Sequence, residues 1–523
     1  MKKAIVTAAV LAVIVAALVF FLRKVPHRPR AAELAPAETI LFAQLPDVWR
    51  SALRWKETAL CQLWSEPEMQ AFLEKPLLQA PYLADLAARY ERIERTALRE
   101  AFVAVTALDG ATVKGVAGIC FAGRSADAEA LMADARGFLQ WPAHAKRGGW
   151  AFIASDAALL QAVLERCEEK SGASLAGNDV FQASCAPLPA DGDALLFALP
   201  EALPAAQGKW FATVRALAAG TRCEGAVLRD TVFFLGPGPA EAPLARNSMA
   251  LSARDTLLYY ATTLPDRPAA PAWLPTDFAA QWPAFARAFG PECGALVDWP
   301  AEEESPTLLL ALEVRNQAHA KALLDALAGT VWGRTEKDGV TYYQAPAQAM
   351  PLLAPTAALT ARQLLLGFSR GAVESGLARL DAGAGVQALG RQAGEPTDAY
   401  GYLDLKTLFE RAYGTLRPFL AMSLAFSETG KFIDVGKLPS AETVSRHLGP
   451  TLHTQRARAG GTLMESVGPI TFHQAALAAM AAAGTAASSS GMEALSKAGG
   501  QSGLLQQLGL PAAAPSSAPP AER

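Results

Sequence analysis

The sequence lacks the short motifs by which thiol, nucleotide and metal chemistry are usually recognised. None of its cysteines forms a C-x-x-C pair, which argues against a thioredoxin-like site or a zinc knuckle. It has no G-x-x-x-x-G-K-[ST] sequence, and Ser427–Lys431 (SETGK) keeps only the Gly-Lys pair. No H-E-x-x-H occurs, and Gly449-Pro450 separates His447 from His453. We therefore predict no metal, no cofactor and no assigned catalytic residue.

An excess of charge of either sign is also missing. The chain has 47 basic and 50 acidic residues among 523, a net charge of −3, so it has no basic field to attract nucleic acid. We expect no nucleic-acid partner. The hydrophobic fraction of 51% is enough for a sizeable core.

The few cysteines leave two interpretations open. A disulfide, for example between Cys167 and Cys185, is conceivable if the compartment is oxidising. We favour buried free thiols, because cysteine often serves as a small core residue. The six positions are Cys61, Cys120, Cys167, Cys185, Cys223 and Cys293.

The longest apolar run lies at the N-terminus. Residues 4–22 carry no charge and, as a helix, would measure about 28 Å, close to the hydrocarbon thickness of a bilayer. A cleaved signal peptide is the alternative, but no small-x-small site follows the run, which ends in Phe20-Phe21-Leu22. We predict an uncleaved transmembrane anchor at 4–22 and a linker at 23–35.

The orientation of this anchor is ambiguous from its charges. Lys2 and Lys3 precede it, while Arg23, Lys24 and two further arginines follow it. A literal count of positive charges keeps the large domain in the cytoplasm. The short basic start followed by an apolar core resembles an export signal, and we favour a single-pass inner-membrane protein with a periplasmic domain.

A repeated pattern points to a tandem duplication. Residues 38–47 (ETILFAQLPD) and 255–266 (DTLLYYATTLPD) share an acid, a threonine, an apolar run and Leu-Pro-Asp. The order of the predicted elements recurs after each. They are, in the first copy, Ile40–Phe42, Val48–Trp55, Phe102–Thr106, Gly115–Phe121, Ser125–Phe138, Phe152–Cys167 and Ala194–Leu203, and, in the second, Leu257–Tyr260, Phe278–Phe289, Gly294–Trp299, Thr307–Leu312, Asn316–Leu327, Leu366–Leu380 and Ala399–Leu408.

Strand pairs that alternate with amphipathic helices predict an α+β fold. We expect two units of about 200 residues, each an antiparallel or mixed sheet with helices packed on it. The units span 36–240 and 247–475, with a Pro/Gly-rich junction between them. We interpret the shared signature as repeated architecture rather than as a repeated active site.

Local signals within the units carry three further predictions. Ser65 and Glu68 have the spacing of a capping box before a helix. Ser155 and Ser369 each end a predicted strand, where they would cap the following helix. The tryptophans at 49, 55 and 64 fall in helices that must cover a sheet, so we expect them in the core.

Residues 484–523 are rich in Ala, Ser, Gly and Pro. They cannot bury enough apolar area to offset their ordering entropy, so we predict a disordered tail. Leu504–Leu510 (LLQQLGL) could form a short helix that docks on a partner, or remain without one.

One catalytic pattern matches and one acidic pair needs explanation. Gly367–Gly371 (GFSRG) fits the nucleophile elbow G-x-S-x-G, with His447, His453 and His473 downstream. A cap at Ser369 explains the same residues, and paired strands do not suggest a hydrolase sheet. Glu302–Glu304 is typical of a solvated hairpin loop. For Asp191/Asp193 the sequence leaves open a meeting of carboxylates across the fold.

The segment Leu34–Glu74 resembles the start of exported bacterial proteins grouped as DUF3352, those of planctomycetes and verrucomicrobia above all. Their opening, Leu-Pro-Ala-(Asp/Glu)-Thr, is followed by an apolar run, Val-Pro-Asp and a Trp-rich helical segment. Here Ala35 replaces the leucine and Leu45-Pro46-Asp47 replaces Val-Pro-Asp. His447–Thr471 also resembles such proteins. The resemblance implies export and an envelope location, and no reaction.

Together these observations favour a non-enzymatic role. We expect a membrane-anchored envelope protein that binds or scaffolds an unidentified protein or polymer. The alternative is an envelope hydrolase acting on wall or surface polymers, with its site between the two units. A cleft lined by apolar and backbone groups would favour binding, and converging carboxylates would favour the enzyme.

Overall fold

The computed structural model describes residues 29–79, 96–109, 112–168, 172–202, 213–237, 244–264, 280–303, 305–329, 332–346, 354–382, 397–426 and 434–475. The predicted anchor at 4–22 and the predicted tail at 484–523 lie outside these residues. Among the described residues, no helix combines the length and the apolar character needed to cross a membrane.

The first half of the chain, up to residue 237, alternates strands and helices. The strands are β1 (Leu41–Leu45), β2 (Leu98–Asp109), β3 (Thr112–Phe121), β4 (Ala143–Arg147), β5 (Trp150–Ala154), β6 (Ala194–Ala198), β7 (Ala216–Glu224) and β8 (Val227–Leu235). The helices are α2 (Ala31–Leu34), α3 (Val48–Glu57), α4 (Ala59–Trp64), α5 (Pro67–Gln79), α8 (Ser125–Leu139), α9 (Ala157–Cys167), η1 (Leu175–Gly177), α10 (Asp179–Cys185) and η2 (Pro200–Ala202).

The second half, from residue 244, follows the same alternation. Its strands are β9 (Thr256–Thr263), β10 (Phe289–Asp298), β11 (Thr307–Val314), β12 (Gly333–Lys337), β13 (Val340–Gln344), β14 (Thr356–Leu359), β15 (Gln363–Gly367), β16 (Ala399–Asp404), β17 (Pro450–Arg458) and β18 (Gly461–Gly468). Its helices are η4 (Asn247–Leu251), α12 (Trp282–Ala288), α13 (Gln317–Ala328), α14 (Arg370–Ala382), α16 (Leu405–Phe426), η7 (Val435–Lys437) and α17 (Ala441–Ser445).

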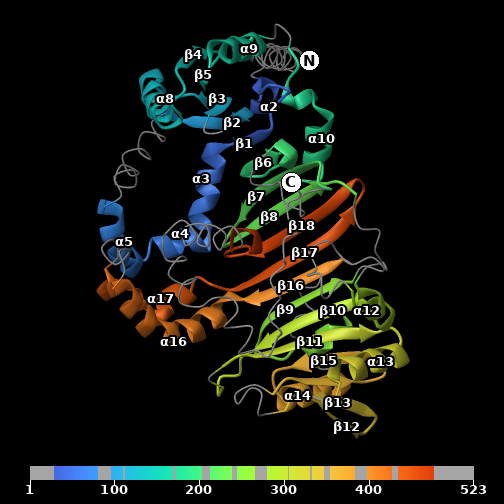
Figure 1. The fold of residues 1–523 in the computed structure, drawn as a ribbon. Coiled ribbons are helices and arrows are strands. Elements are labelled where there is room, and N and C mark those ends of the chain that lie inside the picture. Colours follow the sequence, from blue (N-terminus) through green and yellow to red (C-terminus); the bar gives the residue numbers. More distant parts are fainter. Residues whose placement is uncertain are drawn as a thin grey trace, which may run out of the picture.

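All these strands belong to one antiparallel sheet of 18 strands, which confirms the α+β class and the antiparallel alternative. The pairings give the spatial order β4-β5-β3-β2-β1-β6-β7-β8-β18-β17-β16-β9-β10-β11-β15-β14-β13-β12. Figure 1 shows β8 of the first half lying beside β18 of the second, so the sheet continues from one half into the other.

Successive side chains in a strand point to opposite faces of the sheet. Face 1 carries Phe42, Phe102 and Phe197, which are almost fully buried under α2, α9 and α10. In the second half the same face carries Tyr259 and Tyr400, covered by η4 and α14. Edge-to-face ring contacts, such as that between Phe181 and Phe197, fill this layer.

Face 2 is the opposite side of the same strands. In the second half α12 and α13 bury Leu312, Tyr343 and Leu364 there. In the first half α8 covers only the β3–β5 end, where Met132 packs on Ile153. The middle of face 2 is the part of the sheet on which the groove described below lies.

Helices α3 to α5 form an arm that reaches from the first half to the second (Figure 1). Glu66 Oε1 lies 2.6 Å from His447 Nε2, and the Glu68 carboxylate accepts the Ser440 N–H at 2.7 Å. Lys437 Nζ donates to Glu74 at 2.8 Å. These contacts hold the arm on the segment around α17.

Two of the predicted caps are wrong, for identifiable reasons. Ser65 ends α4 and donates its hydroxyl to the Cys61 carbonyl, while Glu68 is engaged by Ser440, so no capping box forms. Asp156, not Ser155, accepts the Leu159 N–H at the start of α9. An aspartate one position later competes successfully for the same role.

The expectation that the three tryptophans are buried is also wrong. Trp49, Trp55 and Trp64 are 58%, 43% and 49% exposed on α3 and α4. Arg50, Ser51 and Arg54 place the polar side of α3 on the sheet, so the apolar side of this helix faces outward.

Candidate binding groove

A groove of about 600 Å³ lies on face 2 of the first half. Its floor is made by β1, β2, β3, β6, β7 and β8, and α8 forms one wall with Met132, Ala135 and Leu139. The floor includes Ala43, Leu45, Val103, Leu196, Ala219 and Val232.

The groove exists because small side chains alternate with larger ones across the strands. Ala43 stands opposite Leu196 in the β1–β6 pair, and Leu196 stands opposite Ala219 in the β6–β7 pair. The alanine side chain is short, so the alanines leave an unfilled space above the sheet beside α8. Leu45 and Leu196 are left 43% and 39% exposed, so the groove offers unpaired apolar surface.

One end of the groove is polar. Thr221, Asp230, His473 and Gln474 lie there. The Asp230 carboxylate accepts hydrogen bonds from the hydroxyls of Thr221, at 2.7 Å, and of Thr471. Neutral hydroxyl donors therefore satisfy this buried carboxylate.

At the polar end, His473 contacts a second histidine, His453 of β17, which does not itself line the groove. The rings of His453 and His473 are 5.6 Å apart and perpendicular. Both nitrogens of His473 and Nδ1 of His453 are buried and have no hydrogen-bond partner among the described residues. Burial lowers the pKa of His453 to about 4, with a smaller contribution from His473, and burial also lowers the pKa of His473 against the opposing effect of Asp230. Both rings are neutral at pH 7.

A helix begins at this end of the groove. The Thr471 hydroxyl accepts the Gln474 N–H at 3.2 Å, and the Gln474 side chain accepts the Thr471 N–H at 3.3 Å. This reciprocal pair is a capping box. Phe472 donates its N–H to Ser466 Oγ on β18 at 2.8 Å, which fixes the start of the helix to the sheet.

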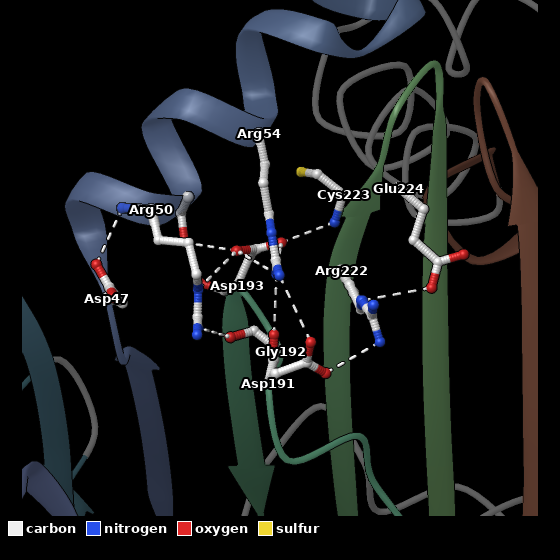
Figure 2. A network of polar contacts seen from close by, with 10 residues as sticks. Asp47, Arg50, Arg54, Asp191, Gly192, Asp193, Arg222, Cys223 and Glu224 are labelled. Carbon is white, nitrogen blue, oxygen red and sulfur yellow. Dashed lines mark hydrogen bonds and ion pairs between the residues drawn. The ribbon is translucent and has the colours of Figure 1, made fainter.

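The acidic pair Asp191/Asp193 lies at the end of β6, beside the groove, and is engaged by arginines (Figure 2). Asp193 is 4% exposed, accepts the Ser51 hydroxyl at 2.9 Å and the Cys223 N–H at 2.8 Å, and pairs with Arg54 at 3.4 Å. Asp191 accepts Arg222 Nη1 at 3.0 Å.

Backbone carbonyls complete this cluster, which we call the α3 clamp. Arg50 donates to the Gly192 carbonyl at 3.0 Å, and Arg54 donates to the Asp191 carbonyl at 3.1 Å. The carboxylates do converge, as the sequence left open, but on guanidinium groups. Such pairing holds α3 against the sheet. The missed signal is Arg50 and Arg54, four residues apart on one helix face.

The other residues singled out from the sequence have structural roles. Ser369 Oγ accepts the Ala372 N–H at 3.2 Å, which confirms the predicted cap of α14. Of the downstream histidines, His447 pairs with Glu66, and His453 contacts His473, which lines the groove. Glu302 and Glu303 lie in the connection between β10 and β11, as predicted.

All six cysteines lie in the described part of the chain, and no disulfide joins them. Burial raises the pKa of Cys185 to about 12 and, with neighbouring carboxylates, the pKa of Cys223 and Cys293 to about 11. These three thiols are therefore poor nucleophiles at neutral pH. Within the described part of the chain, no group of three or more His, Cys, Asp or Glu side chains is arranged to hold a metal ion.

Comparison of the chain with protein-family models, with curated proteins and with solved structures gave no match.

Proposed function

We propose that this chain is a single-pass inner-membrane protein of the envelope, with its large domain in the periplasm and a non-enzymatic binding role. The apolar run at 4–22 and the resemblance of the segment from 34 to 74 to exported DUF3352 proteins support the anchor and the location. Anchoring would keep the binding groove near the membrane surface.

We also propose that the domain arose by tandem duplication. Strands β1, β2, β3, β4, β5, β6, β7 and β8 correspond in order and pairing to β9, β10, β11, β14, β15, β16, β17 and β18. Each series starts with a central strand, β1 or β9, paired on both sides. The hairpin β12–β13 is then an insertion in the second copy.

The seam between the halves supports this proposal. Thr231 lies four residues after Val227, which closes the β7–β8 turn, and Glu465 lies four residues after Gly461, which closes the β17–β18 turn. Thr231 pairs with Glu465 in the antiparallel β8–β18 ladder. Equivalent residues therefore meet at one pair, as they would on a two-fold axis.

The groove carries the binding role. It combines an apolar floor with one polar end, and its polar groups include the buried imidazole of His473, a hydroxyl-bonded carboxylate and an amide. Ligand sites typically combine an apolar lining with a few placed polar groups. A ligand with an apolar body and a polar terminus fits this arrangement.

A photo-crosslinking amino acid at Leu196, in the full chain in its own membrane, tests the proposal. We expect defined adducts at Leu196, because its side chain is 39% exposed in the groove. Ala219→Trp should abolish them by filling the groove. The same amino acid at Leu327, 62% exposed on α13, is the control and should give none. Equal labelling at Leu196 and Leu327 would contradict a binding role for the groove.

A further inference from the structure

The floor of the groove consists of rows of side chains that run across the strands. Residues paired between neighbouring strands lie side by side on one face, so each row takes one residue from every strand. Large and small apolar side chains alternate along the central row, which is Ala117, Val103, Ala43, Leu196, Ala219 and Val232. The neighbouring row is apolar as well until it reaches Thr221 and Asp230.

The width of the groove matches one hydrocarbon chain. Its floor crosses the strands from β3 to β8, which lie about 4.8 Å apart, so it is about 24 Å long. Spread over this length, its volume of about 600 Å³ gives a mean cross-section of about 25 Å². Carbon atoms that are not bonded to each other touch at about 4 Å, so a channel of this cross-section holds one chain and not two side by side.

The apolar part of the floor is long enough for an acyl chain. It runs from Ala117 on β3 to Ala219 on β7, four strand spacings or about 19 Å. In a bilayer whose hydrocarbon core is about 30 Å thick, each of two opposed chains occupies about 15 Å. An acyl chain therefore fits within the apolar part, and the head that it carries lies at the polar end.

The polar end of the groove selects against a charged head. The hydrogen bonds that the described residues donate to the buried Asp230 carboxylate come from the hydroxyls of Thr221 and Thr471. These donors are neutral, so a carboxylate or phosphate head would meet a like charge in an otherwise apolar site. A cationic head would have to leave water for a carboxylate that is already hydrogen-bonded, which is also costly.

A hydroxyl head satisfies the same end of the groove. Gln474 accepts the Thr471 N–H with its side-chain oxygen, so its amide NH₂ is the group that can donate to a ligand. A hydroxyl is both donor and acceptor. It can therefore accept the hydrogen bond of Gln474 and donate its own proton to Asp230.

We propose that the groove binds a single-chain amphiphile with a neutral hydroxyl head, such as a monoacylglycerol. The acyl chain lies across the strands and the head lies at Asp230. This step rests on the proposed function, because it names the ligand class of the same groove. A lipid with two chains is too wide for the groove, and a lipid with an anionic head carries the wrong charge.

Photoreactive lipids test this ligand class. Three probes carry the same diazirine-bearing acyl chain: a monoacylglycerol, the same molecule with a phosphate on its head, and a diacylglycerol. Each is added in equal amount to membranes that contain the full chain, and labelled residues are identified by mass spectrometry. We expect the monoacylglycerol to label Leu196 and Met132 about tenfold more than either of the others. Equal labelling by all three probes, or stronger labelling by the phosphate probe, would overturn the proposal.

Variants assign the selection to the groove and separate it from the binding role. Asp230→Asn removes the charge and should bring labelling by the phosphate probe close to that by the monoacylglycerol; an unchanged ratio would refute selection by Asp230. Ala219→Trp should abolish labelling, whereas Leu327→Trp, on the exposed side of α13, should not change it.

The unaltered chain distinguishes the two proposals without any variant of the lipid site. If no lipid probe labels the groove while a photo-crosslinking amino acid at Leu196 captures another molecule, the lipid class is refuted and the binding role stands. If Leu196 captures nothing either, the binding role itself fails.

Discussion

Face 2 of the sheet is covered over β11, β13 and β15 in the second half and open over β1, β6 and β7 in the first. In the second half α12 and α13 bring Phe285, Leu323 and Leu324 onto Leu312 and Leu364. In the first half α8 covers one end only, and β1, β6 and β7 present alanines and exposed leucines to the groove. The same face of one sheet is thus a core in one half and a surface in the other.

The helices beside the two regions are held by different forces. Helix α13 packs through apolar side chains, whereas α3 is held by the clamp of arginines and aspartates and leaves Trp49 and Leu53 exposed. Apolar burial closes a face tightly, while a charged clamp fixes a helix beside the face without filling it. We infer that the second half contributes more to stability and the first half contributes the site.

The largest expected effect tests the closed region. Leu364→Ala removes a side chain that is 2% exposed and should lower the free energy of unfolding by about 3 kcal/mol. Leu196→Ala, at a position 39% exposed in the groove, should cost less than about 1 kcal/mol. Urea unfolding of the full chain, followed by tryptophan fluorescence, measures both. Equal losses would show that the two halves of face 2 are equally packed.

The next largest loss of stability is expected from substitutions in the α3 clamp. Asp193→Ala leaves Arg54 and the Cys223 N–H without their buried acceptor and should cost about 2 kcal/mol. Asp191→Ala is the matched control. Its side chain is 44% exposed, so we expect a loss below about 1 kcal/mol. A larger loss at Asp191 than at Asp193 would mean that the surface pair, and not the buried one, anchors α3.

Much of the fold could be predicted from the sequence, because it follows from periodicity. The strands around Phe102 and Gly115 and the helix from Ser125 lie where apolar spacing placed them. Caps were less predictable: Ser155 and Asp156 are adjacent, and only the backbone geometry selects the aspartate. Local pattern cannot rank two suitable cap residues.

The candidate site could be predicted far less well. Small residues make a groove only when strands distant in sequence, such as β1 and β7, place Ala43 and Ala219 on one face. The exposure of the tryptophans of α3 and α4 could not be predicted, because the sequence of an amphipathic helix does not show which of its sides packs on the sheet. Arg50 and Arg54 turn the polar side inward, and their acceptors come from residues 191–193.

The buried histidine pair beside the polar end of the groove, His453 and His473, predicts a pH effect on stability. The pKa of His453 is about 4 in the folded chain against 6.5 in its ordinary state, so the unfolded chain takes up the proton first as the pH falls. The free energy of unfolding is therefore undiminished above about pH 6.5 and declines towards about pH 4. From about pH 7 to about pH 5.5 we expect a loss of about 1 kcal/mol from this group.

Substitution can assign that pH effect to His453. His453→Gln should flatten the decline of the free energy of unfolding between about pH 7 and about pH 5.5, and His473 accounts for a remaining part. An unchanged slope in the His453 variant would place the titrating groups elsewhere.

The smallest effect compares the caps of two helices, α9 and α14, which each follow a strand of the sheet. Ser369→Ala should cost about 0.5–1 kcal/mol, because the Ala372 N–H loses its acceptor, and Ser369→Thr should restore most of it. Asp156→Ala should cost a similar amount at α9. A nucleophile would respond differently, since threonine rarely replaces a catalytic serine without loss. If the Ser369→Thr variant kept its stability but lost a measurable hydrolysis of envelope polymers, Ser369 would be a nucleophile and not only a helix cap.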